Sequence, residues 1–315
     1  MQLPDSFINT IINVYKKDGE NFLAVLPVLF DEVSQRWNLS DIKPVSNLSF
    51  NFVAFAKQVS IHPTSAGYST NEHKDVILKM GVPNPELTSE IAALKLFNGS
   101  GACQLIEHDE ERGLLLLERL KPGMMLSELE DDDKRTHIAA DVMLNIQRRG
   151  GVTPPLQNKF IKLSDWFEGL KKIRPYFDGG TGPFPKELLE KVGSFLPELF
   201  ADTDIKLMHG DFHHFNILSS ERGWLVIDPK GVIGPAGYEV GPLMLNPWDS
   251  LSDGVNFQIK TERRVSILAE RLSWGREKII KWATAHAVLS AWWSIEAGMD
   301  TEYAIQCAEI FSRLK

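Results

Sequence analysis

The sequence predicts an α+β protein of two lobes, in which a helical start and a β-sheet are followed by a mostly helical second half. Two observations lead to this prediction. Residues 41–120 contain short runs rich in Phe, Val, Ile and Leu between turn-forming residues, which is typical of a sheet built from hairpins. Residues 128–297 contain long stretches with apolar residues at helical spacing. We therefore expect an N-terminal lobe of residues 1–120 and a C-terminal lobe of residues 121–315.

Composition and charge exclude several classes of protein. With 315 residues, of which 43% are hydrophobic and 24% charged, the chain is long enough for a large core. Its net charge of −8 argues against nucleic acid as a partner and suits a cationic small molecule, although ordinary cytoplasmic proteins are also often acidic. The two cysteines, Cys103 and Cys307, indicate a reducing compartment. No apolar run reaches the length of a membrane span, so we expect a cytoplasmic protein without a membrane partner. We also expect either a monomer or a weak homodimer.

The first 40 residues are expected to form a helical extension of two helices. Apolar residues recur at helical spacing over residues 4–18, where Asp5 is suited to begin the helix and Gly19 to end it. The second helix, with Pro27 in its first turn, carries an apolar stripe of Leu29, Val33 and Trp37. The two helices would form an amphipathic hairpin that packs on the lobe behind it.

The sheet of the first lobe is expected to contain two hairpins. Residues 41–61 are rich in strand formers on either side of a turn at residues 46–51. A second pair of strands is predicted at residues 103–107 and 113–120, joined by a turn at residues 109–112. The continuous apolar character of the last strand indicates burial on both of its faces.

A strand and a helix between these hairpins carry a possible ion pair. Residues 75–80 form a short apolar strand that is interrupted by one lysine, Lys79. A helix is predicted to start near Ser89 and carries Glu90. Taken alone, Lys79 either points to solvent at the edge of the sheet or is held for an anionic ligand.

The second lobe is expected to be helical around one irregular segment. An acidic run at residues 128–133 favours the start of a helix, because negative charge stabilises the N-terminal end of the helix dipole. Residues 229–239 are rich in Gly and Pro and predict a loop. Helices are predicted at residues 135–148, 164–173, 186–200, 260–271 and 276–297.

The most informative stretch is His209-Gly210-Asp211, with Asn216 five positions after the aspartate and Asp228 at the end of a following β-type run. A carboxylate such as Asp211 can orient a hydroxyl nucleophile and accept its proton. The amide oxygen of Asn216 and the carboxylate of Asp228 are hard ligands that suit Mg²⁺ beside nucleotide phosphates. Each of these residue types is also common in simple turns. In this order and spacing they indicate phosphoryl transfer.

This motif, continued by residues 223–231 and by Asn246-Pro247, resembles the aminoglycoside phosphotransferase group of kinase-like enzymes, and within it the streptomycin 6-phosphotransferase and hydroxyurea phosphotransferase branch. The resemblance covers nearly the whole chain and implies a bilobal protein-kinase-like fold with ATP between the lobes. It also implies that Lys79, paired with Glu90, binds the α- and β-phosphates, and that Asp211 is the catalytic base.

The resemblance further implies where the rest of the nucleotide is bound. The hairpin of residues 41–61 would cover the phosphates. Because it lacks a G-x-G-x-x-G motif, its contacts would come from Ser49, Asn51 and their neighbours. The backbone around Glu118 and Leu120 would form hydrogen bonds with the nucleotide base.

The implied acceptor is a small molecule with a hydroxyl group, either an aminocyclitol antibiotic such as streptomycin or hydroxyurea. Carboxylates can bind a polar or cationic acceptor, which makes Glu239, Asp249 and Glu296 candidates. Trp293 is a candidate for the wall of the acceptor pocket. The ordinary interpretations, solvated or structural acids and a core tryptophan, also stay open for these four residues.

Two other functions are compatible with the sequence. The chain could be a kinase of another small metabolite, such as an amino sugar or a choline-like alcohol, because a fold does not fix a substrate. It could also be a catalytically silent nucleotide-binding protein. The joint presence of Lys79, Asp211, Asn216 and Asp228 argues against the silent protein, which would be free to lose any of them.

Overall fold

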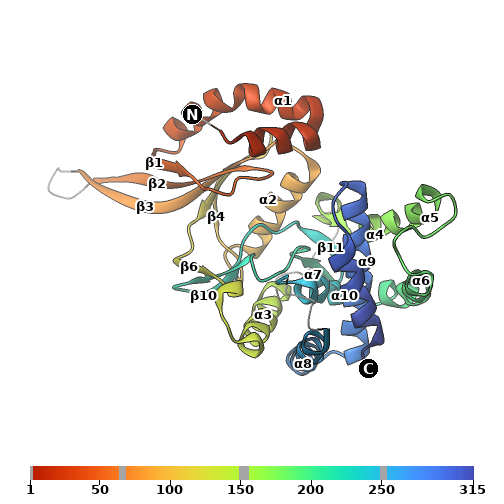
Figure 1. Cartoon of the computed structure of the whole chain (residues 1–315). Coiled ribbons are helices and arrows are strands. Elements are labelled where there is room, and N and C mark those ends of the chain that lie inside the picture. The colour runs from red at the N-terminus through yellow and green to blue at the C-terminus, as the bar shows by residue number, and fades with distance from the viewer. Residues whose placement is uncertain (1–2, 64–68, 149–155, 249–253) are drawn as a thin grey trace. The chain divides into compact units, whose positions relative to one another are not determined.

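The structure is a computed structural model that describes residues 3–63, 69–148, 156–248 and 254–315 (Figure 1). The chain divides into two compact units. Unit 1 holds the residues up to Gly99 together with Cys103–Leu120, and unit 2 holds Ser100–Ala102 together with Lys121–Lys315. A sheet dominates unit 1 and helices dominate unit 2, so the predicted α+β class is confirmed.

Unit 1 is built on a five-stranded antiparallel sheet with the strand order β1-β2-β3-β5-β4. Strands β2 and β3 form its longest hairpin, in which Val53 lies opposite Lys79. The elements of this unit are α1 (Asp5–Arg36), β1 (Leu39–Pro44), β2 (Phe52–Pro63), β3 (Ser69–Met80), α2 (Pro85–Phe97), β4 (Leu105–Asp109) and β5 (Leu114–Glu118).

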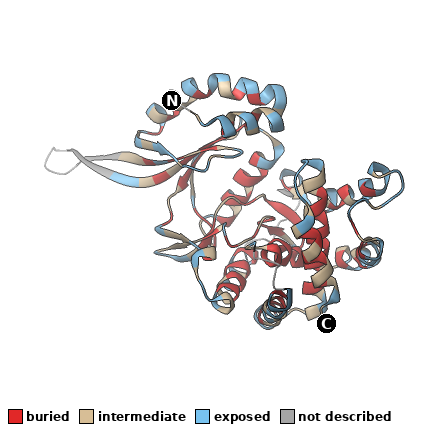
Figure 2. Ribbon diagram, in the orientation of Figure 1, coloured by how far each residue is buried: buried red, intermediate tan, exposed pale blue. Residues whose placement is uncertain are grey.

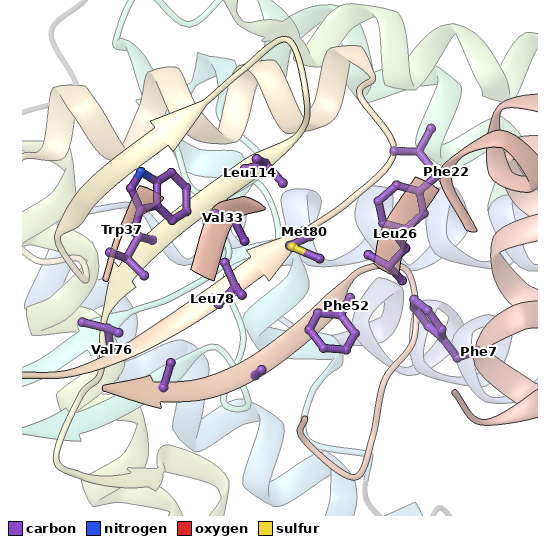
Figure 3. Close-up of a cluster of buried hydrophobic side chains, with 14 of the residues drawn as sticks. Phe7, Phe22, Leu26, Val33, Trp37, Phe52, Val76, Leu78, Met80 and Leu114 are labelled. Carbon is purple, nitrogen blue, oxygen red and sulfur yellow. The ribbon is translucent and has the colours of Figure 1, made fainter. Parts of the chain in front are cut away.

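A cluster of apolar side chains joins α1 to one face of this sheet (Figure 3). Each large side chain that is fully buried in such a core contributes about 1.5–3 kcal/mol. Because side chains alternate along a strand, Val76, Leu78 and Met80 of β3 enter the cluster and Lys79 points to the opposite face. The cluster also includes Phe7, Phe22, Leu26, Val33, Trp37, Phe52 and Leu114.

The N-terminal extension contains two helical segments, but the break lies at a different residue from the one predicted. Lys16 has φ 52° and ψ −122°, which interrupts α1, and the second segment continues through Gly19. A Cβ atom at Gly19 would clash with the carbonyl oxygen of Ile11. Gly19 therefore permits a close approach of the two segments and does not end a helix. Pro4, and not Asp5, occupies the N-cap position.

Unit 2 combines helices with two small three-stranded sheets, of strand orders β10-β9-β6 and β7-β11-β8. Its elements are β6 (Pro122–Met125), η1 (Leu126–Glu128), α3 (Asp132–Gln147), η2 (Leu156–Lys159), β7 (Ile161–Lys162), α4 (Leu163–Phe167), η3 (Glu168–Lys172), α5 (Ile173–Tyr176), α6 (Lys186–Phe200), β8 (Ile205–Met208), β9 (Ile217–Ser220), β10 (Gly223–Val226), β11 (Val232–Pro235), η4 (Ala236–Glu239), α7 (Val240–Leu245), α8 (Gly254–Leu272), α9 (Arg276–Glu296) and α10 (Glu302–Arg313).

Helix α9 is the centre of unit 2. Helices α6, α7, α8 and α10 all contact it, and it is buried over most of its length (Figure 2). Two glycines bring η4 and α7 directly against it. A Cβ atom at Gly237 would lie 2.5 Å from Nε1 of Trp282, and one at Gly241 would lie 2.5 Å from Cβ of His286. Neither position has room for a larger residue.

Three parts of unit 2 differ from the prediction. The segment of residues 229–239 was expected to be a loop, yet it contains the buried strand β11, which pairs with β7 and β8. The helix predicted at residues 164–173 is divided into α4, η3 and α5. Helix α10 was not predicted. Among the described residues, no helix combines the length and the apolar character needed to cross a bilayer.

Candidate active site

The loop of residues 209–216 joins β8 to β9 and is fixed by a buried acid from η4. Glu239 is fully buried, and its two carboxylate oxygens accept the backbone N–H groups of His209 (2.7 Å) and Gly210 (2.9 Å). Gly210 has φ 86°, and a Cβ atom there would overlap with the side chain of Val232. The residue before Asp211 must therefore be glycine, and the loop has one defined course.

His209 ties this loop to the chain just before Asp228. Its Nδ1 accepts the backbone N–H of Asp211 at 3.2 Å, and its Nε2 lies 2.8 Å from the carbonyl oxygen of Ile227. With Nδ1 an acceptor, Nε2 carries the proton and donates it to Ile227. Burial lowers the pKa of His209 to about 4, so the ring is neutral in this arrangement.

Asp211 is the ionised group of the loop. Burial alone would raise its pKa, but the hydrogen bond with His213 and the charge of Lys230 lower it to about 2. His213 Nε2 lies 3.4 Å from Oδ1, and the Asp211 side chain is still 39% exposed. The carboxylate can therefore reach a ligand while it is held in one orientation.

Asn216 and Asp228 lie at the two chain segments that meet at this loop. The side-chain amide of Asn216 donates from Nδ2 to the backbone oxygen of Asp211 at 3.0 Å, which fixes the amide plane and leaves Oδ1 as its acceptor atom. The backbone oxygen of Asn216 accepts the N–H of Ile227 at 3.0 Å, directly before Asp228. Ile227 also lies 2.8 Å from His209 Nε2 through its carbonyl oxygen, so the residue before Asp228 is tied to both ends of the loop that carries Asp211.

The donor set fits a magnesium ion that is shared with phosphate. No cluster of three or more His, Cys, Asp or Glu side chains that could hold a metal occurs in the described part of the chain. A metal site built from three such side chains is therefore not present among those residues. Mg²⁺ commonly takes one or two protein oxygens and completes its shell with substrate phosphate and water. Asn216 Oδ1 and the carboxylate of Asp228 match that pattern.

The predicted ion pair of Lys79 with Glu90 is present in unit 1. Nζ lies 2.7 Å from both carboxylate oxygens, and each of the two residues is only 5% exposed. Helix α2 starts earlier than predicted, because Asn84 caps it by accepting the N–H groups of Glu86 and Leu87. Both residues of the pair are therefore held on regular secondary structure, Lys79 on β3 and Glu90 on α2.

The other predicted nucleotide contacts occupy different environments in unit 1. Ser49 is exposed in the turn between β1 and β2, and Asn51 follows it immediately before β2. Glu118 ends β5, where its side chain accepts the backbone N–H of Gln104 at 2.9 Å. Leu120 is buried just after this strand. Their contacts with a nucleotide stay predictions.

The four predicted acceptor residues divide into three groups. The prediction for Glu239 is corrected: it is sealed in the core with both oxygens bound to backbone N–H groups, so it shapes the loop and is out of reach of an acceptor. Trp293 is partly exposed, and Glu296 lies at the exposed end of α9, where it pairs with Lys172 at 3.3 Å. Asp249 lies outside the described residues.

One pair near the loop was missed. Tyr238, the residue before Glu239, has its hydroxyl 2.9 Å from Nδ1 of His286 on α9. The signal in the sequence was a lone histidine on an apolar helix, four residues after Trp282 and seven before Trp293. That signal is weak, because only the fold shows which buried group the histidine meets.

Comparison with known proteins places these features in a family. The family model for aminoglycoside/hydroxyurea antibiotic resistance kinases matches residues 65–298. The chain is 25% identical over 300 residues to streptomycin 6-kinase of Streptomyces glaucescens, a match that covers 95% of this chain and 92% of the relative. It is 26% identical over 310 residues to hydroxyurea phosphotransferase of Kitasatospora aureofaciens, with coverage of 95% and 82%.

Solved structures agree with the predicted fold. Choline kinase LicA from Streptococcus pneumoniae has a TM-score of 0.59 at 16% identity, covering 92% of this chain and 99% of that chain. Aminoglycoside phosphotransferase APH(4)-Ia, crystallised as a thermostable mutant in a ternary complex with ADP and hygromycin B, has a TM-score of 0.60 at 10% identity, with coverage of 90% and 97%. The prediction of a protein-kinase-like fold is confirmed.

Proposed function

This chain belongs to the aminoglycoside/hydroxyurea antibiotic resistance kinases, and we propose that it transfers the γ-phosphoryl group of ATP to a hydroxyl group of a small-molecule antibiotic. Streptomycin and hydroxyurea are the leading acceptors, because the relatives that match almost the whole chain carry those names. The observation that supports the proposal most strongly is the fixed loop of residues 209–216. It holds an ionised, accessible Asp211 five residues before Asn216.

Asp211 would act on the acceptor hydroxyl. Its carboxylate accepts the hydroxyl hydrogen bond and turns the oxygen toward the γ-phosphorus. As the new P–O bond forms and the bond to the β–γ bridging oxygen breaks, the hydroxyl proton passes to the carboxylate. A pKa of about 2 makes Asp211 a weak base. Its main contribution is therefore orientation, and the proton transfers late.

Lys79 would bind the α- and β-phosphates of the nucleotide. The ammonium group is held by both oxygens of Glu90 in a buried position, which fixes where its positive charge lies. A lysine that is fixed in this way stabilises phosphate charge without first losing side-chain freedom.

Asn216 and Asp228 would hold magnesium through Oδ1 and a carboxylate oxygen. When bound, the ion would neutralise phosphate charge during transfer. In this chain, the hydrogen bond from Asn216 Nδ2 to Asp211 links the orientation of the metal ligand to the residue that orients the acceptor. Displacement of either residue would therefore disturb the other.

Steady-state turnover tests this proposal. The purified chain is assayed for ADP release with ATP and Mg²⁺ against streptomycin, hydroxyurea and choline, and products are identified by mass spectrometry. We expect phosphorylation of an antibiotic, and loss of about 10²–10⁴-fold in kcat for Asp211→Asn. Asp18→Asn, at an exposed position of α1, is the control and should be fully active.

The same panel separates the alternatives. Turnover of choline alone would indicate a kinase of another small metabolite. ATP binding without turnover of any acceptor would indicate a catalytically silent protein and contradict the proposal. Full activity in Asp211→Asn would remove Asp211 from its assigned role.

A further inference from the structure

Tyr238 and His286 form a buried pair directly beside the loop that carries Asp211. Tyr238 is fully buried in η4, one residue before the Glu239 that fixes this loop. Aromatic side chains surround its ring with centroids 5.7–6.0 Å away, namely Trp166, Phe167 and Trp282. The ring cannot move without disturbing this cluster, so the position of its hydroxyl is fixed.

The hydrogen bond between the two residues determines the tautomer of His286. The buried Tyr238 hydroxyl lies 2.9 Å from Nδ1 of His286, and it has no other acceptor among the described residues. If Nδ1 were the donor, the hydroxyl hydrogen would be left unpaired in the core, which is unfavourable. The hydroxyl therefore donates to Nδ1, and Nε2 carries the ring proton. Burial lowers the pKa of His286 to about 4, so the ring is uncharged.

The protonated Nε2 of His286 is not completely sealed by the protein. It makes no hydrogen bond within the described part of the chain. It nevertheless keeps some solvent-accessible surface, unlike the fully buried polar atoms of the described residues that lack a partner. The residue as a whole is 6% exposed, which agrees with one ring edge reaching the surface. His286 therefore offers an unused hydrogen-bond donor at a fixed position.

The residues around this donor include a predicted residue of the acceptor site. The ring of Trp293, a predicted wall of that site, lies 6.2 Å from the His286 ring and 5.3 Å from Trp166. Tyr238 directly precedes Glu239, whose carboxylate accepts the N–H groups of His209 and Gly210 just before Asp211. A molecule that places a hydroxyl at Asp211 and packs on Trp293 would meet the Nε2–H group of His286.

We infer that His286, oriented by Tyr238, donates its Nε2–H to an oxygen of the acceptor that lies close to the hydroxyl that is phosphorylated. This inference rests on the proposed phosphotransferase function and adds a binding residue to it. It also narrows the acceptor to compounds with a second oxygen near the reactive hydroxyl, as in a polyhydroxylated ring. An uncharged donor suits a cationic acceptor, because it adds no repulsion.

Two substitutions at His286 separate binding of the acceptor from a role in the core. His286→Asn places an amide oxygen near the position of Nδ1, so it keeps a partner for Tyr238 but loses the outer donor. His286→Gln places an amide nitrogen near the position of Nε2, so it keeps a donor but loses the inner partner. KM for MgATP, KM for the acceptor, and the melting temperature are measured for both, with the panel acceptor that the wild type phosphorylates fastest.

We expect His286→Asn to raise the acceptor KM about tenfold, the effect of one lost neutral hydrogen bond, and to leave the KM for MgATP unchanged. His286→Gln should bind the acceptor better than His286→Asn, although it melts at a lower temperature. His137→Asn, a partly exposed histidine of α3, should match the wild type in all three measurements.

The opposite order would overturn the inference. If His286→Asn keeps the wild-type acceptor KM while His286→Gln loses affinity for it, the pair serves only the core. That result would leave wild-type turnover intact, so the proposed function would stand. A wild type that phosphorylates no acceptor of the panel would overturn the proposed function, and this inference with it.

Discussion

Glu239 accepts the backbone N–H of Gly210 at 2.9 Å, although the two residues are 29 positions apart in the chain. The second oxygen of the same carboxylate accepts the N–H of His209. These two N–H groups precede Asp211 directly and would be unpaired in the core without Glu239. The orientation of Asp211 is therefore set from η4, by an acid that no acceptor can reach.

Glu239→Gln should impair catalysis more than nucleotide binding. An amide offers one accepting oxygen and turns an NH₂ group toward the second N–H, so one buried donor loses its partner at a cost of about 1–3 kcal/mol. We expect kcat to fall about 10–100-fold, because small displacements of a reacting group are costly, while the KM for ATP stays within about twofold. Steady-state kinetics measure both. Glu277→Gln, at an exposed position of α9, should have wild-type kinetics, and wild-type kcat in Glu239→Gln would refute the argument.

The sequence was sufficient for features that depend on local order. The residues around Asp211 lie in one short stretch, so their types, order and spacing indicated phosphoryl transfer and carried the resemblance to a kinase family. The order of a strand with Lys79 and a helix with Glu90 then predicted the ion pair through that resemblance. The roles of Glu239 and His286 could not be predicted, because each depends on a contact between η4 and a distant segment. Strand β11 was missed because it is rich in Gly and Pro, and only its neighbours β7 and β8 supply its pairing.

The ion pair of Lys79 and Glu90 should show strong coupling in stability. Breaking a buried ion pair by removing one partner costs about 3–5 kcal/mol, because the remaining charge loses the counter-charge of this pair, whereas removing both avoids most of that cost. We expect Lys79→Met and Glu90→Gln each to lower the free energy of unfolding in urea, and the double variant to be more stable than either single variant. Asp41 and Lys57 provide the control pair, because their side chains are 61% and 45% exposed and Asp41→Asn should leave the free energy of unfolding almost unchanged. Additive effects at Lys79 and Glu90 would rule out the coupling.

Stability should depend on pH through buried histidines. Burial lowers the pKa of His209 and of His286 to about 4, so below pH 6.5 the unfolded chain takes up protons that the folded chain does not. Each neutral histidine contributes to the free energy of unfolding in full above pH 6.5. This contribution is lost as the pH falls toward 4, at about 1.4 kcal/mol per pH unit. Urea unfolding of His286→Asn between pH 4.5 and 6.5 should therefore show a shallower pH dependence than the wild type.

Glu239 should affect the pH dependence of stability in the opposite direction. Burial raises its pKa to about 7, so its contribution is fully present below pH 4.5 and is lost as the pH rises through 7. It opposes the histidines over the same range. Glu239→Gln should therefore make the loss of stability on acidification steeper, measured as the free energy of unfolding at pH 4.5 and 6.5. A shallower dependence in this variant would mean that Glu239 is ionised throughout.

Gly210→Ala should be more damaging than the same change at a second glycine with a similar backbone. Gly210 and Gly223 have φ 86° and 96°, so alanine at either position carries left-handed strain of about 1–2 kcal/mol. At Gly223 the new methyl group enters open space, whereas at Gly210 it overlaps with Val232 and adds about 1–3 kcal/mol. Because movement of the loop before Asp211 would relieve this overlap, Gly210→Ala should also lose kcat, and Gly223→Ala should keep it. Urea unfolding and steady-state kinetics of the two variants measure the difference. Equal losses of stability and kcat in both variants would show that the Val232 side chain moves aside and that the course of the loop is not fixed at Gly210.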